Sequence, residues 1–234
     1  MWDHSPLAAD FAVDAAGAAF PHLAAEQVTP GFLAGGEPIG LLVISHVLNE
    51  LTAAELLAVR GLTARAAAIL WVEPGTNEAS RALIEVREQL RERFHIVAPC
   101  THQQNCGLLA PKNARHWCHH FADPPPAIFG DYTWVKFGRR ARIDLRSLPY
   151  SFLALAREAS PSAEAGQARV IGRPRAYKGF ARVLSCDGAG VDELMVQKRD
   201  APELFKDLRD PTGALLYRWR REGDRILDGE KATR

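Results

Sequence analysis

The chain has 234 residues, of which 47% are hydrophobic and 24% are charged. This composition excludes an intrinsically disordered chain, a collagen-like repeat and a coiled coil, and the length suits one large or two small domains. Apolar runs such as Gly40–Ile44 are far shorter than the ~20 residues of a membrane-spanning helix. Because no Lys or Arg precedes Arg60, we expect a cytoplasmic protein with no basic leader and no membrane partner.

The charge is distributed unevenly along the chain. Residues 1–90 hold four Arg and eleven acidic residues, a net charge of −7, whereas the remainder has a net charge of +8. Such a split suggests an acidic domain joined to a basic domain that faces nucleic acid. The alternative is a general preference for Arg, since the chain holds 23 Arg against 6 Lys.

The first hundred residues alternate between helix and strand signals. Thr52 and Glu55 form a capping-box pattern at the start of a helix. Short apolar runs bounded by Gly and Pro predict buried strands between the helices. This alternation is typical of a doubly wound α/β sheet. The predicted elements are helices over 7–25, 52–60 and 76–90, and strands over 39–45, 66–72 and 94–98.

The second half differs from the first in composition and in its predicted secondary structure. Residues 99–130 hold three Cys, four His and a run of three Pro, which is too irregular for regular structure and too long for an idle loop. We predict strands over 132–146, 150–157, 169–172, 179–186 and 193–198, a linker over 158–168, a helix over 202–209 and a basic, polar tail. The second half is therefore expected to be rich in β-structure.

The four cysteines are Cys100, Cys106, Cys118 and Cys186. A cytoplasmic location disfavours two disulfides, and free structural thiols usually lie inside regular elements. A metal site remains, and four thiolates suit zinc and an iron–sulfur cluster equally well. The chain has no closely spaced pair of cysteines of the zinc-finger type. A mixed zinc site with two Cys and two of the nearby histidines, His102, His116, His119 and His120, stays open.

These cysteines lie in a pattern that resembles a known family. The segments Pro99–His102 and Trp117–His119, with Cys106 between them, resemble the signature of methyltransferase-like proteins that act in small-ribosomal-subunit assembly. Further segments resemble that family in matching order. They are Trp2–Pro6, Ser45–Leu51, Val72–Thr76, Tyr150–Phe152 and Ser185–Cys186.

The resemblance implies a 4Fe-4S cluster held by Cys100, Cys106, Cys118 and Cys186, although Leu108–Arg115 resembles an insertion in the family's pattern. It also implies a Rossmann-like class I S-adenosylmethionine (SAM) methyltransferase core with a basic, β-rich extension. Asp3 then corresponds to the acid that holds the ribose of SAM. The Gly-rich turn of such a core should precede that acid in the chain. We therefore expect that this sequence is a fragment, that its start codon was assigned too late, or that the protein has lost SAM binding.

Polar residues follow the predicted strand over 39–45. Open α/β sheets place ligands at this end of their strands, so Ser45, His46, Asn49 and Glu50 are expected to face a cofactor or substrate. The alternative is that they serve only as loop and helix-cap residues.

Cations and aromatic residues are mixed on the predicted strands of the second half. Such surfaces bind the RNA backbone and stack its bases, and the alternative is a solvated sheet face. The aromatic residues are Tyr177 and Phe180. The predicted RNA-binding residues are Arg139, Arg140, Arg142, Arg173, Arg175, Lys178 and Arg182.

We therefore expect a partial α/β methyltransferase core over 1–98, a metal-binding loop over 99–130, and the rest of the sheet with a basic RNA-binding extension over 131–234. The leading hypothesis is an rRNA methyltransferase-like monomer that acts on the small ribosomal subunit and is stabilised by the cluster. The alternative is a non-catalytic RNA-binding assembly factor that holds iron–sulfur or zinc and has lost SAM binding.

Overall fold

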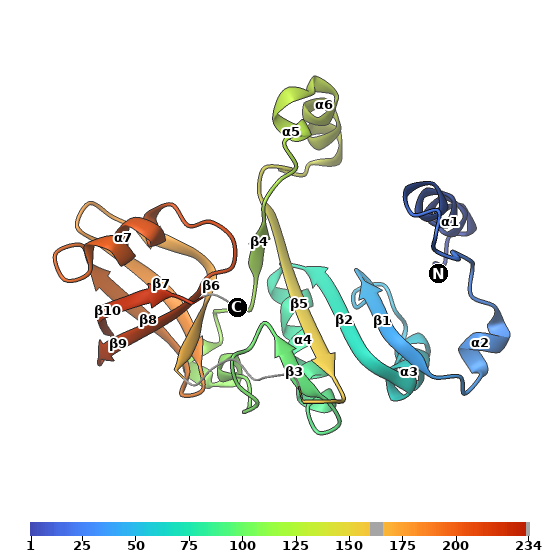
Figure 1. Cartoon of the computed structure of the whole chain (residues 1–234), viewed down its shortest axis with the longest axis horizontal. Coiled ribbons are helices and arrows are strands. Elements are labelled where there is room, and N and C mark those ends of the chain that lie inside the picture. Colours follow the sequence, from blue (N-terminus) through green and yellow to red (C-terminus); the bar gives the residue numbers. More distant parts are fainter. Residues whose placement is uncertain (160–165, 233–234) are drawn as a thin grey trace.

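The computed structural model describes residues 1–159 and 166–232, and it contains an open sheet beside a closed barrel (Figure 1). In chain order the elements are α1 (Pro6–Ala19), α2 (Pro30–Ala34), β1 (Ile39–Ser45), α3 (Ala53–Arg65), β2 (Ala66–Pro74), α4 (Asn77–Leu90), β3 (His95–Ala98), η1 (Gly107–Leu109), η2 (Pro111–Asn113), β4 (His120–Ala122), α5 (Ala127–Gly130), α6 (Tyr132–Ala141), β5 (Leu148–Ala156), β6 (Gln167–Ala176), β7 (Phe180–Asp187), β8 (Gly190–Gln197), α7 (Pro202–Arg209), β9 (Leu216–Glu222) and β10 (Arg225–Lys231). None of the helices described is long and apolar enough to cross a membrane.

The open sheet has the strand order β1-β2-β5-β3, and β4 pairs with β5. β1 and β2 are parallel, and β5 is antiparallel to β2 and β3, so β1, β2 and β3 point the same way. Ile69, Trp71 and Leu153 pack beneath α4 in the buried core of this unit. Leu41 and Val43 lie on the opposite face of β1 and are 57% and 59% exposed.

Local signals set the helix starts in this unit. The Thr52–Glu55 capping box is present, and α3 runs to Arg65, somewhat beyond the predicted end. Thr76 caps α4 as predicted. α1 ends at Ala19, earlier than predicted, because a proline follows at position 21 and the residue before a proline is pushed out of the helical region.

The barrel closes in the strand order β10-β8-β7-β6-β9. β8 and β10 are parallel, whereas the other neighbouring strands are antiparallel. Leu204, Phe205 and Leu208 of α7 pack into the barrel core beside Tyr217 and Ile226. The predicted strands over 169–172, 179–186 and 193–198 are confirmed as parts of β6, β7 and β8. The described start of β6 is Gln167, and residues 160–165 of the predicted linker lie outside the described residues.

The prediction of a basic, polar tail was wrong. β9 and β10 form a hairpin that closes the barrel. Leu216, Tyr217 and Ile226 are at most 1% exposed, whereas charged residues dominate the sequence around them. Burial of these few apolar side chains against distant strands decides the structure here, which the local composition could not indicate.

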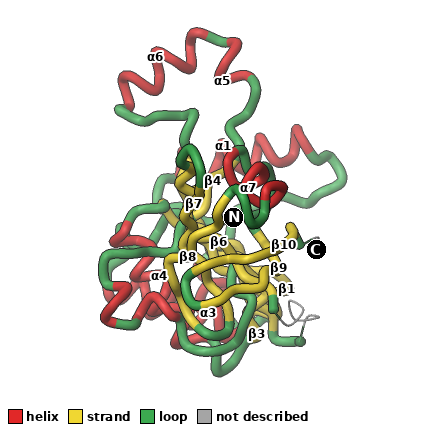
Figure 2. The backbone as a smooth tube through the Cα atoms, turned by 90° about the vertical axis from the view of Figure 1, so that its left-hand side faces the viewer, coloured by secondary structure: helices red, strands yellow, loops and turns green. Residues whose placement is uncertain are grey.

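The predicted strand over 132–146 was also wrong, because Tyr132–Ala141 forms α6. The Asp131 side chain accepts a hydrogen bond from the Thr133 backbone N–H at 2.8 Å and caps this helix. The helix ends at Arg142, which adopts the left-handed conformation with φ of 56°. Figures 1 and 2 both show α5 and α6 standing away from the sheet and the barrel.

Candidate metal centre

The four cysteines come from both units of the fold. Cys100 follows β3, Cys106 precedes η1, Cys118 precedes β4, and Cys186 lies near the end of β7. Cys106 and Cys186 are buried in one cluster, against which Cys118 packs. Burial and the charges of Cys100, Cys118 and Cys106 raise the pKa of Cys186 well above its ordinary value. Cys100, Cys106 and Cys118 also line one small cavity. The structure therefore brings the four thiols together, and we name these four residues the thiol cluster.

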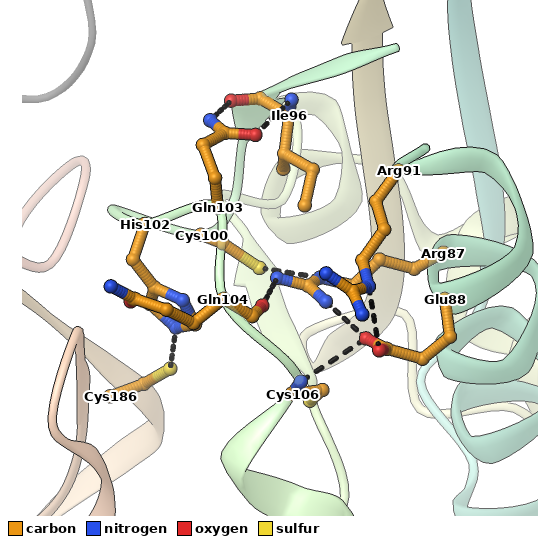
Figure 3. A network of polar contacts seen from close by, with 10 residues as sticks. All are labelled: Arg87, Glu88, Arg91, Ile96, Cys100, His102, Gln103, Gln104, Cys106 and Cys186. Atoms are coloured by element: carbon orange, nitrogen blue, oxygen red, sulfur yellow. Dashed lines mark hydrogen bonds and ion pairs between the residues drawn. The ribbon is translucent and has the colours of Figure 1, made fainter. Parts of the chain in front are cut away.

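A buried arginine lies directly beside these thiols. Arg87 on α4 is 3% exposed, and its Nε donates to the Cys100 Sγ at 3.3 Å. Its Nη2 donates to the Gln104 carbonyl at 2.7 Å, and it also pairs with Glu88 (Figure 3). Burial alone would lower the pKa of Arg87, but Cys100, Cys106 and Glu88 outweigh burial and raise it. The charge of Arg87 in turn opposes the rise that burial causes in the pKa of Cys106.

A second buried arginine approaches from the barrel. Arg169 on β6 is 7% exposed, and its Nε donates to the Pro99 carbonyl. Burial and the neighbouring thiols raise the pKa of Cys118, while the charges of Arg169 and Arg87 oppose this rise. Thus two cations, one from each unit, face the thiol cluster.

Two buried polar atoms next to the cysteines have no hydrogen-bond partner among the described residues. They are the Thr101 Oγ1 and the His102 Nδ1. Unsatisfied buried donors are costly, so they suit a bound group that offers acceptors. The donor set and the two arginines therefore fit an anionic metal–thiolate group.

Two of the four histidines considered for zinc lie near thiols. The His102 Nε2 is 3.8 Å from the Cys186 Sγ, and the His120 Nε2 is 3.7 Å from the Cys118 Sγ. Burial lowers the pKa of His120 to about 3, so this ring is neutral. His119 instead stacks on Trp117, and His116 accepts from the Arg115 Nε at 3.2 Å. In the described ranges, no three His, Cys, Asp or Glu side chains already surround a point that one metal ion could occupy.

The cysteine-bearing segment 99–118 is tied to the open sheet's unit. The hydroxyls of Ser80 on α4 and Ser151 on β5 both donate to the Cys118 carbonyl, at 2.7 and 2.6 Å. The Cys106 N–H donates to the Glu88 carboxylate at 3.1 Å. Hydrogen bonds from two elements thus hold the loop backbone on this side.

The same segment is tied to the barrel. The Asn113 side chain donates to the Val191 carbonyl at 3.0 Å. Directly after the segment, the His119 carbonyl accepts from the Gly172 N–H at 2.8 Å. A Cβ on Gly172 would lie 2.7 Å from the His119 ring, and one on Gly107 would lie 2.7 Å from the Val191 nitrogen. Figure 1 shows the segment lying between the two units, so the thiol cluster is their joint.

A second candidate site lies at the end of β1. Ser45, His46, Asn49 and Glu50 are all exposed there. The loop between β1 and α3 depends on Glu73, which is 0% exposed at the end of β2. The Glu73 Oε1 accepts from the Trp71 Nε1 at 2.7 Å and from two loop N–H groups, those of Val47 and Leu48, at 3.2 Å each.

Sequence reasoning missed Glu73 as part of this site. Its Oε2 is also buried, without a hydrogen-bond partner in the described part of the chain. The available signal was a carboxylate directly after a buried strand and directly before a proline.

Asp3 was predicted to hold the ribose of SAM, a role that places the acid at the end of a strand. It lies in the exposed segment before α1, and its carboxylate accepts from the Ser5 N–H at 2.8 Å. Residues 1–5 form no strand, so Asp3 does not end one. The segment instead leads into α1, which Ser5 caps, and a role for Asp3 in binding the ribose of SAM stays a prediction.

The predicted RNA-binding residues divide between two surfaces. Arg139 and Arg140 lie in the last turn of α6, and Arg142 ends it, so the strand predicted for them was wrong. The other four lie on the barrel, where they are exposed. They are Arg173, Arg175, Lys178 and Arg182. The Arg173 guanidinium lies 4.0 Å from the centre of the Phe121 ring. Arg175 and Arg182 both pair with Glu193, and Lys178 lies in the β6–β7 loop.

Comparison with known proteins identifies the family. The family model described as "mitochondrial small ribosomal subunit Rsm22" matches residues 22–215. A comparison with curated proteins finds no match. The matched range covers the open sheet, the thiol cluster, and β6, β7, β8 and α7 of the barrel, and it ends before β9. The chain therefore belongs to the Rsm22 family, a methyltransferase-like family of the mitochondrial small ribosomal subunit.

Proposed function

We propose that this chain is an RNA-binding, methyltransferase-like monomer that acts in the assembly of the small ribosomal subunit and whose two units are joined by a 4Fe-4S cluster. The observation that carries the proposal is the convergence of four cysteines from both units on buried arginines. Family membership supports the link to the small subunit. We keep the cytoplasm as the proposed location.

Cys100, Cys106, Cys118 and Cys186 would hold the cluster. Arg87 and Arg169 would offset the negative charge of the four thiolates that hold the cluster. A zinc ion held by four thiolates would also be negatively charged, so the arginines alone do not distinguish the two metal groups. The unpartnered hydroxyl of Thr101 favours iron–sulfur, because its bridging sulfides add acceptors that a zinc ion lacks. Bound only in the folded state, the cluster would stabilise the joint.

The metal content tests this part directly. We would purify the full chain without oxygen, record its visible spectrum and measure iron, sulfide and zinc. A broad band near about 400 nm with about four irons per chain would support the cluster. A colourless protein with about one zinc would instead support the zinc-stabilised alternative.

The methyltransferase activity is the finer part of the proposal. The parallel strands β1, β2 and β3, with α3 and α4 between them in the chain, support a Rossmann-like core. SAM would bind at the carboxyl ends of β1 and β2, near Ser45, His46, Asn49 and Glu50. It would supply the methyl group, while the buried Glu73 holds the loop backbone in place.

The position of Asp3 favours a second candidate function. A ribose-binding acid would end a strand, whereas Asp3 precedes α1. The second candidate is an assembly factor that binds RNA and uses the core as a scaffold without SAM. Titration calorimetry of the holoprotein with SAM separates the two candidates. Micromolar binding supports the enzyme, and absent binding supports the scaffold.

The basic surfaces support RNA binding. The α6 arginines stand on a projecting helix and Lys178 on the barrel, so both can approach a polyanion. Replacing Arg139 and Arg140 by Ala should reduce the slope of log affinity against log salt by about 1.4 on single-stranded RNA. Replacing Arg60, an exposed arginine of α3, by Ala is the matched control and should leave the slope unchanged.

A further inference from the structure

An exposed aromatic pair marks the loop between β6 and β7. The rings of Tyr177 and Phe180 stack with centroids 4.6 Å apart and planes 15° apart. The Tyr177 N–H donates to the Phe180 carbonyl at 2.8 Å, so the two residues face each other across a tight turn. Tyr177 is 48% exposed and Phe180 is half-buried. Phe180 therefore supports one face of the Tyr177 ring.

Cations surround this pair. Lys178 lies in the turn itself, and Lys198 and Arg199 lie on the neighbouring turn between β8 and α7. The Lys198 N–H donates to the Gly179 carbonyl at 2.9 Å, which ties the two turns together. All three cations are exposed, and within residues 1–159 and 166–232 neither lysine has an ion-pair partner. Gly179, Gln197, Lys198 and Arg199 line an open pocket of about 540 Å³.

The position of this loop in the barrel matches a known ligand-binding position. The barrel has five strands in Greek-key order with α7 between its third and fourth strands, which is the arrangement of an OB-fold. OB-fold barrels bind oligonucleotides on their second and third strands and on the loop between the first two strands. In this chain those elements are β7, β8 and the loop that carries Tyr177.

We propose that Tyr177, Phe180, Lys178, Lys198 and Arg199 form a site for single-stranded RNA, which we name the Tyr177 platform. An unpaired base stacks on the Tyr177 ring, and the three cations contact the flanking phosphates. The faces of bases in a duplex are covered by their neighbours, so the platform selects unpaired RNA. This inference rests on the proposed RNA-binding function and names its RNA class.

The platform is well separated from the thiol cluster. Phe180 begins β7 and Cys186 lies near its other end. Six residues of extended strand span about 20 Å. Changes to the Tyr177 side chain should therefore leave the metal content and the joint intact. Any loss of RNA affinity can then be assigned to the platform and not to the thiol cluster.

The test measures fluorescence anisotropy of a labelled, unstructured RNA of about 12 nucleotides, with full-chain protein purified without oxygen. Tyr177→Ala should weaken binding about tenfold or more, whereas Tyr177→Trp should retain it within about twofold. Phe11→Ala, which removes an aromatic ring that is 73% exposed on α1, is the matched control and should change nothing. Lys178→Ala with Lys198→Ala should reduce the salt slope by about 1.4, which Tyr177→Ala should not do.

Three results would count against these claims, and they differ in what they overturn. Unchanged affinity of Tyr177→Ala, with wild-type protein that binds the RNA, overturns the platform alone. Tighter wild-type binding to the same RNA annealed to its complement also overturns the platform alone. Absence of wild-type binding to either RNA overturns the RNA-binding part of the proposed function together with the platform.

Discussion

The thiol cluster and the β1–α3 loop are built in opposite ways. The cysteines are buried or half-buried, and arginines from both units approach them. The candidate residues of the β1–α3 loop are all exposed, and its backbone depends on the single buried carboxylate of Glu73. Both sites have a buried charged group, but Arg87 contacts a candidate metal-binding thiol, whereas Glu73 contacts the loop backbone and Trp71.

This difference separates two kinds of site. Burial and mutual repulsion raise the pKa of Cys118 and Cys186, so the thiolate forms would need nearby counter-charges, which Arg87 and Arg169 offer. Such a site suits a permanently bound group that joins parts of the fold. An exposed loop with a rigid backbone suits a ligand that exchanges with solvent.

The largest expected effect comes from breaking the joint. Cys186→Ser removes the thiol that the barrel contributes, and loss of a structural metal group costs several kcal/mol. We expect loss of iron, a drop in the melting temperature of about 10 °C or more and faster proteolysis of the barrel. We also expect weaker RNA binding, although Cys186 itself is buried. Unchanged proteolytic resistance and RNA affinity would contradict the joint.

A somewhat smaller effect is expected from the buried cation of the thiol cluster. Arg87→Leu leaves the Gln104 carbonyl without its donor and removes one cation from Glu88, which keeps the Arg91 guanidinium and the Cys106 N–H. It should lower the free energy of unfolding by about 1–3 kcal/mol, with partial loss of iron. Urea unfolding and iron analysis measure both effects. Arg91 lies four residues after Arg87, and its side chain is more exposed. Arg91→Leu is therefore the control, and the variant protein should retain its iron. Full iron content in Arg87→Leu would show that the cation is dispensable.

The β1–α3 loop should respond differently. Glu73→Ala leaves the Trp71 Nε1 and the Val47 and Leu48 N–H groups without an acceptor and should cost about 2–3 kcal/mol in urea unfolding. Glu78→Ala removes an exposed carboxylate on α4 and serves as the control. Iron content should stay unchanged in both variants. Iron loss in Glu73→Ala would mean that the two sites are not independent.

The smallest expected effect concerns the helix that follows this loop. Thr52→Ala removes the acceptor for the Glu55 N–H and should lower the free energy of unfolding by about 1 kcal/mol. Thermal unfolding of the iron-loaded protein is the measurement. A loss of more than about 2 kcal/mol would indicate that Thr52 does more than cap α3.

Sequence reasoning succeeded where the signal was local. The strand 39–45, the Thr52 cap and the Thr76 cap depend on residues within a few positions of each other. The four cysteines were identified from their residue type and from the family signature. Arg87 was not identified, because a charged residue among other charged residues gives no local sign that it is buried. Glu73 follows a buried strand, but nothing local shows which distant N–H groups it binds.

The sequence by itself determined the family, the alternation of helix and strand over the first hundred residues and the candidate ligands for a metal. These features depend on residue type, periodicity and short-range hydrogen bonds. Only the tertiary structure decided that α6 is a projecting helix, that β9 and β10 close the barrel, and that Arg87 and Arg169 face the thiols. Those outcomes depend on burial and pairing between segments far apart in the chain, which no local pattern specifies.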